Sequence, residues 1–207
     1  MADPFTILGI AGSLRRDSFN RSLLQHAADC APDGVVVAIY DGLGTIAHFN
    51  EDLEADGGPA EVLDLRDRID AADALFVVTP EYNSAMPGVL KNALDWASRP
   101  PGASALAGKP AAAMGASPGR FGAARAREQV RMVLTAIGAD VLDREVPVAK
   151  VHEALAEDGS VIDDDVAARV GGLVDALVQS AGCPTPAESA DLAVHSRACR
   201  QPVAASG

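Results

Sequence analysis

The pattern of apolar and polar positions divides the chain into short apolar runs that alternate with amphipathic segments. The apolar runs are bounded by glycine, proline or polar residues, which is typical of strands buried on both faces of a parallel sheet. They occupy residues 5–11, 35–40, 74–78, 111–116 and 141–148, and the last run is more polar than the others. The pattern therefore predicts five strands.

The segments between these runs place their apolar residues on one helical face. Helices are predicted over about residues 19–28, 60–71, 87–98, 123–137 and 163–181. Pro87 is expected at the first helical position, and Gly138 is expected to end its helix. The run Asp163–Asp165 is typical of a helix N-terminus, where the helix dipole favours negative charge.

Strand and helix alternate five times, which predicts an α/β fold with helices on both faces of a parallel sheet. Two doubly wound folds fit this alternation: the six-stranded dinucleotide-binding fold and the five-stranded flavodoxin-like fold. The first carries a G-x-G-x-x-G motif after its first strand, and this chain has none there. Asp41 ends the second strand, as an acidic residue does in the dinucleotide-binding fold, but without those glycines it is weak support for that fold. We therefore predict a flavodoxin-like sheet of order 2-1-3-4-5.

Residues 1–182 are predicted to form this one domain. Residues 183–207 are rich in alanine, serine and proline and show little periodicity. They are predicted to form a C-terminal tail that is loosely held or bound to a partner.

Composition and charge narrow the function classes. The chain has 207 residues, 48% of them hydrophobic, and a net charge of −12 from 17 basic and 29 acidic residues. This acidic balance disfavours a nucleic-acid partner. No apolar run approaches the roughly 18 residues of a membrane span, and the N-terminus lacks the charged and apolar regions of a signal peptide. We expect a cytoplasmic protein without a membrane partner.

The potential metal ligands are scattered along the chain. Cys30, Cys183 and Cys199 are far apart and odd in number, and the four histidines show no ligand spacing. No metal site is predicted, and Cys30 is expected to pack within its helix.

The loop after the first strand carries the clearest chemical signal. Ser13, Arg15, Ser18 and Asn20 lie between the end of that strand and the start of a helix. A helix N-terminus offers unpaired N–H groups and partial positive charge, and these side chains add the donors that a phosphate monoester needs. Ser18 alone could be a helix N-cap, but capping does not require the other three. We predict a site for a terminal phosphate, hence for a mononucleotide.

Two later loops are predicted to lie beside this site. In a five-stranded doubly wound sheet the ligand binds beyond the carboxyl ends of strands one, three and four. The loops there read TPEYNSAMPG, from Thr79 to Gly88, and GASPGRFG, from Gly115 to Gly122. Their small and rigid residues would let a flat ring approach the backbone, with Tyr82 packing beside it.

Two of these stretches resemble a known family. GSLRRDSFNR, from Gly12 to Arg21, and PEYNSAMPGVLKNALDW, from Pro80 to Trp96, are similar to the NADPH-dependent FMN reductase family, which includes chromate- and quinone-reducing flavoproteins. The resemblance runs from about Phe5 to Leu177. It implies a flavodoxin-like fold, tightly bound FMN, NADPH or NADH as electron donor, and dimers or tetramers.

The same resemblance implies roles for individual residues. The FMN phosphate would be held by Ser13, Arg15, Ser18 and Asn20. The flavin ring would be lined by Pro80, Glu81, Tyr82 and Asn83, with Ser117 and Gly119 at its other edge. Ser84 and Ala85 replace bulkier residues often seen in the family, which implies a roomier substrate pocket.

The resemblance also implies the reaction. A hydride would pass from NAD(P)H to FMN and then to a small-molecule acceptor such as a quinone, a flavin or chromate. Negative charge developing on the ring would be met by backbone N–H groups, so no catalytic side chain is assigned. Glu81 and Tyr82 are candidates for positioning, although turn structure beside Pro80 explains them equally well.

Three alternatives remain. A flavodoxin-type electron carrier without catalysis would share the fold and the cofactor, and a ligand-sensing or structural homologue would have lost FMN. The residues Gly115–Gly119 also match G-x-S-x-G, which suggests a serine hydrolase with Ser117 as nucleophile. Pro118 opposes this reading, because the residue after the serine must supply an N–H to the oxyanion hole and proline has none.

Overall fold

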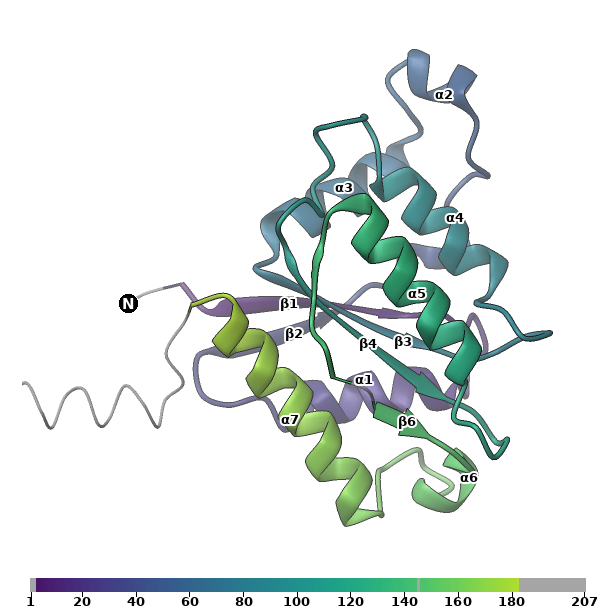
Figure 1. The fold of residues 1–207 in the computed structure, drawn as a ribbon, viewed down its shortest axis with the longest axis vertical. Coiled ribbons are helices and arrows are strands. Elements are labelled where there is room, and N and C mark those ends of the chain that lie inside the picture. The colour runs from purple at the N-terminus through teal and green to yellow at the C-terminus, as the bar shows by residue number, and fades with distance from the viewer. Residues whose placement is uncertain (1–2, 145, 183–207) are drawn as a thin grey trace, which may run out of the picture.

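A computed structural model describes residues 3–182, apart from residue 145, as strands and helices that alternate along the chain (Figure 1). The strands are β1 (Phe5–Ala11), β2 (Val35–Ile39), β3 (Ala74–Thr79), β4 (Pro110–Ala116), β5 (Asp140–Val141) and β6 (Val146–Val148). The longer helices are α1 (Phe19–Asp29), α3 (Ala60–Ala71), α4 (Gly88–Ala97), α5 (Ala124–Ile137) and α7 (Asp164–Ser180). The short elements, which the hydrophobic pattern did not predict, are η1 (Gly42–Gly44), α2 (Glu51–Ala55) and α6 (Val151–Ala154).

All strand pairs are parallel. The hydrogen-bonded order is β2-β1-β3-β4-β5, and β6 also pairs with β4. This order confirms the predicted flavodoxin-like doubly wound arrangement.

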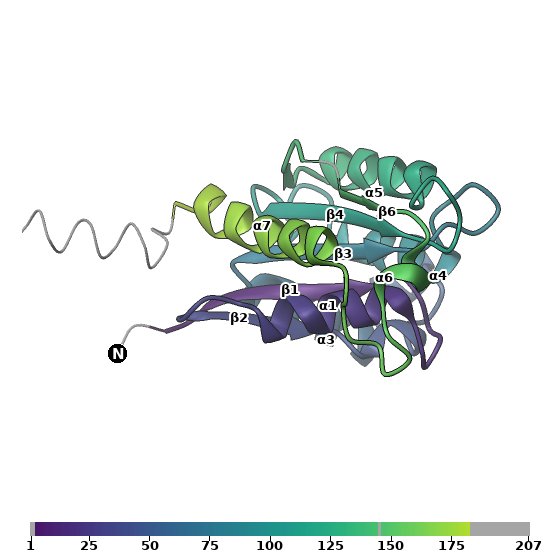
Figure 2. The same ribbon diagram turned by 90° about the horizontal axis from the view of Figure 1, so that it is seen from below.

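The two faces of the sheet carry separate hydrophobic clusters. Along β3, Leu75 and Val77 belong to the cluster shared with α3, α4 and α5, whereas Phe76 and Val78 belong to the cluster shared with α1 and α7. Figure 2 looks from the side on which α1 and α7 lie. Side chains of successive strand residues point to opposite faces, so a strand that is apolar throughout must be covered on both. This is why the central strands read as unbroken apolar runs.

The predicted fifth strand is interrupted. β5 pairs with the first residues of β4 and β6 with its last, and the chain leaves the ladder between them. Arg131 of α5 donates to Leu142 O at 2.6 Å, and Arg144 donates to Gly172 O of α7 at 2.6 Å. Between β5 and β6, polar contacts to α5 and α7 therefore replace strand pairing. The interruption makes this edge of the sheet a poorer template for pairing with another strand.

The excursion between β2 and α3 is anchored on α4. Trp96 Nε1 donates to Ala47 O at 2.8 Å, and Asn92 Oδ1 accepts from Phe49 N at 2.7 Å. The Phe49 and Trp96 rings meet edge to face at 4.9 Å between centroids. Trp96 is fully buried, so it belongs to the hydrophobic core.

Some sequence expectations need correction. Pro87 is the N-cap of α4, one residue before the first helical position. Cys30 is exposed at the end of α1 instead of packed within it. Asp163 caps α7 as expected, because its carboxylate accepts from Val166 N at 3.0 Å. Cys183, Cys199 and the predicted tail lie outside the described residues.

Across residues 3–182, apart from 145, the longest and most apolar helices still fall short of what crossing a membrane requires.

Glu54 ties α2 to the rest of the fold. Its carboxylate lies 2.6 Å from the Arg99 guanidinium and 3.5 Å from that of Arg66, which also donates to Trp96 O. The hydrogen bond from Arg99 is the main reason that the pKa of Glu54 is held below its ordinary value. Because the folded-state pKa is the lower one, the unfolded chain binds more protons as the pH falls. The contribution of Glu54 is therefore present above the unfolded pKa and is lost as the pH falls through the folded one.

Replacing Glu54 with glutamine should therefore lower the Tm at neutral pH, and the difference from the native chain should shrink toward zero below about pH 4. Thermal melts between about pH 3 and pH 7 would measure this. Glu51→Gln, on the exposed first turn of the same helix, is the matched control and should leave the melting curves nearly unchanged. A Tm difference for Glu54→Gln that does not depend on pH would contradict the assignment.

Candidate functional site

Three loops meet at the carboxyl edge of the sheet. They follow β1, β3 and β4, whose ends are held in register by the pairings Ala11 with Val78 and Thr79 with Gly115. Carboxyl ends of parallel strands share one edge, where doubly wound folds bind ligands. The first two loops touch directly, because Ser13 Oγ lies 3.4 Å from the Tyr82 hydroxyl.

Gly12 allows the first loop to lie close against the second. Its N–H donates to Val78 O at 2.8 Å. A Cβ added at Gly12 would lie 3.1 Å from Leu90 Cδ2 and 3.2 Å from both Pro80 Cδ and Thr79 Oγ1. These distances are tighter than ordinary contact, so the small residue sets the spacing of the two loops.

Ser18 and Asn20 are buried polar residues at the start of α1. They are only 3% and 4% exposed, and Ser18 Oγ and Asn20 Oδ1 have no hydrogen-bond partner in the described part of the chain. Ser18 occupies the N-cap position, but its side chain does not cap the helix, unlike that of Asp163 in α7. Buried polar groups without partners cost about 1–3 kcal/mol each, so their presence at a helix N-terminus makes this a candidate ligand site. Rotation of the Asn20 amide would present a donor in place of the oxygen.

The arginines of the first loop give it positive charge. Arg15 and Arg16 are exposed, and the Arg15 guanidinium donates to Asp17 O at 3.0 Å and lies 5.7 Å from the Phe19 ring. Arg21 pairs with Asp41. Together with Ser13, Leu14 and neighbouring residues, these arginines line a depression of about 260 Å³. In a chain of net charge −12, this concentration of guanidinium groups favours an anionic ligand.

The loop after β3 contains a tight turn. Tyr82 and Ala85 exchange backbone hydrogen bonds of 3.0 and 3.1 Å, and Asn83 and Ser84 between them have φ angles of 52° and 65°. Tyr82 is 49% exposed, so its ring is available to a flat ligand on this edge.

Glu81 has a role that the sequence did not reveal. Its Oε2 accepts from the backbone N–H groups of Arg125 at 2.9 Å and Ala126 at 3.3 Å, at the start of α5. The N-cap residue of α5 is Ala123, which has no side-chain oxygen and a φ of 55°. Glu81 thus supplies from a distant loop the capping that α5 cannot supply itself. Its predicted place beside the flavin ring remains a prediction.

The loop after β4 is held by the segment that leads from β6 into α6. Ser117 N donates to Val148 O, Val151 N to Ser117 O, and Lys150 N to Gly119 O, each at 3.1 Å. Gly122 has a φ of 54°, and a Cβ there would lie 2.8 Å from Val148 N. Ser117 and Gly119 are therefore brought to the same edge as Tyr82, as predicted. The sequence placed Gly122 in this loop, but its close approach to Val148 was not predicted, because a lone glycine in a loop carries no distinctive signal.

The hydrolase alternative fails on geometry. Pro118 follows Ser117 and has no N–H to offer an oxyanion. Within the described ranges, no histidine hydrogen-bonds to Ser117. His195 lies outside those ranges.

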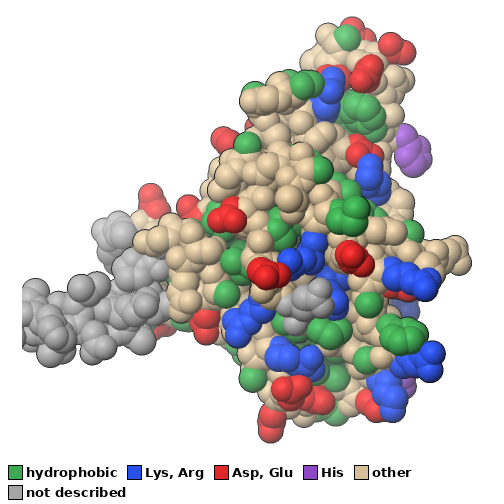
Figure 3. All heavy atoms as spheres, in the orientation of Figure 1, with side chains coloured by type: hydrophobic (Ala, Val, Ile, Leu, Met, Phe, Trp, Pro, Cys, Tyr) green, Lys and Arg blue, Asp and Glu red, His purple; other side chains and the backbone are tan. Residues whose placement is uncertain are grey.

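One exposed apolar side chain stands on each of the three loops. They are Leu14, Tyr82 and Phe121, with 57%, 49% and 64% of their surface exposed. The Arg120 guanidinium lies 4.5 Å from the Phe121 ring. Figure 3 shows several Lys and Arg side chains gathered toward the lower right, on the side where the β4–α5 loop and α6 lie. Apolar surface beside cationic groups suits a ligand with a flat ring and an anionic end.

Two relatives and one solved structure show what this chain is similar to. The chain is 46% identical over 165 residues to an NAD(P)H-dependent FMN reductase of Pseudomonas aeruginosa, covering 79% of this chain and 88% of the relative. It is 36% identical over 177 residues to a quinone reductase of Pseudomonas putida, covering 84% and 94%. A solved flavoenzyme NAD(P)H:(acceptor) oxidoreductase from Paracoccus denitrificans is 40% identical, with a TM-score of 0.75 and coverage of 86% and 97%.

The family assignment follows from these matches and from the site. A flavodoxin of Pseudomonas aeruginosa, at 17% identity and a TM-score of 0.53, shares the fold alone. The model of the NADPH-dependent FMN reductases matches residues 5–153, which include all three loops at the carboxyl edge. The chain belongs to the NADPH-dependent FMN reductase family.

Proposed function

We propose that this protein is an NAD(P)H-dependent oxidoreductase that binds FMN at the carboxyl edge of its sheet and reduces a quinone or a similar small organic acceptor. The observation that carries the proposal is the pair of buried side chains, Ser18 and Asn20, at the N-terminus of α1: within the described residues, Ser18 Oγ and Asn20 Oδ1 have no hydrogen-bond partner. The Ser18 hydroxyl, and the Asn20 amide after rotation, would each donate to a phosphate. A dianionic phosphate accepts several hydrogen bonds and is stabilised at such a terminus.

The donor set at the first loop fits the phosphate of FMN. Ser13, Arg15, Ser18 and Asn20 offer hydroxyl, guanidinium and amide groups within eight residues, and this stretch ends at the N-terminus of α1, whose first N–H groups have no partner within the helix. This segment contains no glycine-rich loop of the kind that binds the two linked phosphates of a dinucleotide. A mononucleotide therefore fits better than a dinucleotide as the resident cofactor.

The other two loops fit the ring of FMN. Pro80, Tyr82 and Asn83 would line one edge, with Ser117 and Gly119 at the other. The contact of Ser13 with Tyr82 would keep the phosphate end and the ring end at a fixed separation. Leu14, Tyr82 and Phe121 would exclude water from the ring and give an aromatic acceptor an apolar surface.

When bound, FMN supplies the redox chemistry, because it takes a hydride from NAD(P)H and passes it to the acceptor. The chain contributes binding and orientation, and backbone N–H groups at the loop ends would stabilise negative charge on the ring. A quinone is favoured as acceptor because relatives at 36% and 39% identity are a quinone reductase and a 2-hydroxy-1,4-benzoquinone reductase. Flavin or chromate as acceptor, and assembly into dimers or tetramers, remain proposals.

The first test is the visible spectrum of the purified protein before and after anaerobic addition of NADPH. An FMN reductase should be yellow, or become so with added FMN, and should bleach on mixing. A protein that stays yellow for minutes would be an electron carrier instead. A protein that neither contains nor retains FMN would contradict the cofactor assignment.

Ser18→Ala tests the phosphate site because it should change the Tm and the FMN affinity in different ways. In FMN-free protein the Tm should stay unchanged or rise, since an unpaired buried hydroxyl is removed. FMN affinity should fall roughly tenfold or more, because a hydrogen bond to a charged group contributes about 1.5–3 kcal/mol. Ser22→Ala, one turn further along α1, is the control and should alter neither quantity. Unchanged FMN affinity in a titration of Ser18→Ala would rule out this residue as a phosphate ligand.

Arg15→Ala should also weaken FMN binding, by roughly 1.5–3 kcal/mol, because it removes a charge-assisted hydrogen bond. The loss should grow as the ionic strength is lowered, since the interaction is electrostatic. Fluorescence titration of apoprotein with FMN at two salt concentrations would measure it. Equal affinity of the variant and the native chain at low salt would count against the predicted role of Arg15.

A further inference from the structure

The turn after β3 is held in a conformation that its own sequence does not favour. Asn83 and Ser84 are consecutive residues with left-handed φ angles of 52° and 65°, and neither is glycine. Asparagine tolerates this region, whereas serine adopts it rarely. Such conformations persist where surrounding contacts impose them, and they are concentrated at functional sites. The contacts that impose this one are therefore of interest.

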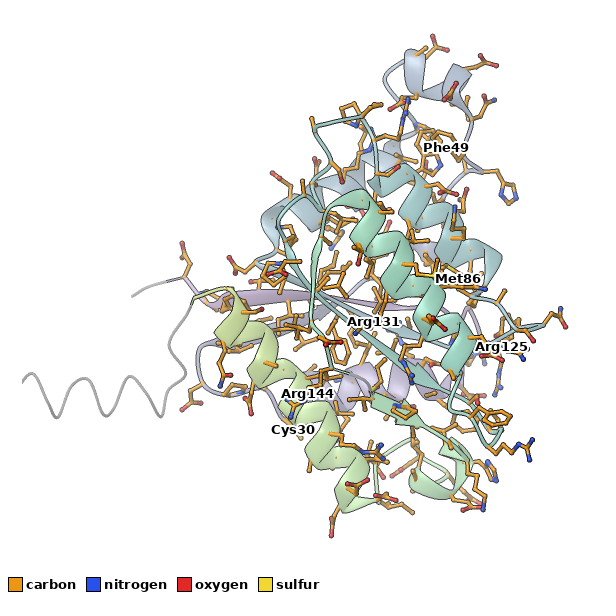
Figure 4. All side chains as sticks on the ribbon, viewed as in Figure 1. Cys30, Phe49, Met86, Arg125, Arg131 and Arg144 are labelled. Atoms are coloured by element: carbon orange, nitrogen blue, oxygen red, sulfur yellow. The ribbon has the colours of Figure 1, made fainter. Side chains whose placement is uncertain are left out.

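Two side chains of α5, Arg125 and Gln129, hold the strained turn; we call them the α5 clamp. Arg125 Nη1 donates to Ser84 Oγ at 2.7 Å, and Gln129 Nε2 donates to Ser84 O at 3.4 Å. Gln129 Oε1 accepts from Met86 N at 3.0 Å. Figure 4 labels Arg125 near the N-terminal end of α5 and Met86 beside the same helix. The amide oxygen and the amide nitrogen of Gln129 are thus both bonded to the backbone of the loop after β3, one within the turn and one just beyond it.

The loop after β3 supports α5 in return. Glu81, which precedes the turn, accepts from the Arg125 and Ala126 N–H groups and so caps α5. Each segment satisfies polar groups that the other leaves open, across a sequence separation of 44 residues. Two backbone hydrogen bonds between Tyr82 and Ala85 close the turn itself, and contacts with a helix that follows the neighbouring strand fix its orientation.

We propose that Gln129 is a positioning residue, which acts with Arg125 and Glu81 to hold the Tyr82–Ala85 turn in its strained form against the ring of the bound cofactor. This inference rests on the function proposed above. The clamp contacts the turn that would face the ring, and none of its residues belongs to the loop that would hold the phosphate. The α5 clamp should therefore affect the rate at which the cofactor is reduced and leave phosphate binding unchanged.

The test uses Gln129→Ala in the full chain, with Glu128→Ala, an exposed neighbour on α5, as the matched control. In FMN-free protein, hydrogen exchange at the Ala85 and Met86 amides should be about tenfold faster in Gln129→Ala, since one net hydrogen bond corresponds to about that factor. With FMN bound, the single-turnover rate of bleaching by NADPH should fall about tenfold, and FMN affinity should stay within about threefold. Glu128→Ala should change none of these quantities.

Two further variants separate positioning from plain stabilisation. Gln129→Glu keeps an oxygen for Met86 N but loses the donor to Ser84 O, so it should restore part of the rate. Ser84→Gly relieves the left-handed strain, because glycine adopts positive φ readily. In that background Gln129→Ala should cost about threefold or less in the rate, because the strain that the clamp opposes has gone.

The outcomes distinguish a failure of the proposed function from a failure of the inference about Gln129. A native chain that NADPH does not bleach would overturn the proposed function, and this inference with it. A native chain that bleaches normally, together with a Gln129→Ala variant of unchanged rate and exchange, would overturn the inference alone. A lowered Tm for Gln129→Ala with normal rate, or the same loss of rate in the native and Ser84→Gly backgrounds, would also overturn it.

Discussion

Parallel pairing of β1, β3 and β4 is the constraint on which the rest of the structure depends. Because these strands run in one direction and in close register, the three segments that follow them must leave the sheet at one edge. The connections back to the opposite edge run through the helices α1, α3, α4 and α5, which cover the two faces. The layout of the core and the location of the site are therefore two consequences of the same pairing.

The loops at this edge are fixed mainly by contacts with one another and with distant elements. Gly12 lets the first loop lie against Pro80, Glu81 caps a helix that follows the next strand, and Val148 holds Ser117 from β6. A cofactor that spanned the edge would meet a surface already organised in its absence. Preorganisation of this kind lowers the ordering cost of binding and keeps donors in place during the reaction.

The sequence predicted the features that depend on local pattern and missed those that depend on distant partners. Buried strands and amphipathic helices have periodic signatures, so β1, β3 and α3 were predicted to within one residue, and the strand order was recovered. The grouping of Ser13, Ser18 and Asn20 after a strand also has a local signature. The capping of α5 by Glu81 does not, because its two members lie 44 residues apart. The break in the fifth strand was missed for the same reason, since Arg131 draws that segment out of the ladder from another element.

Unfavourable local features are concentrated where the ligand would bind. Ser18 Oγ and Asn20 Oδ1, which have no partner within residues 3–182 as described, and the left-handed backbone of Asn83 and Ser84 all lie at the carboxyl edge. Each feature lowers the stability of the empty protein, yet each becomes useful if a phosphate satisfies the first pair and a ring packs on the second. A chain selected for stability alone would have removed them by simple substitutions, such as alanine for Ser18 or glycine for Ser84. Their presence together on one edge is therefore itself an argument that this edge, and not another part of the surface, carries the function.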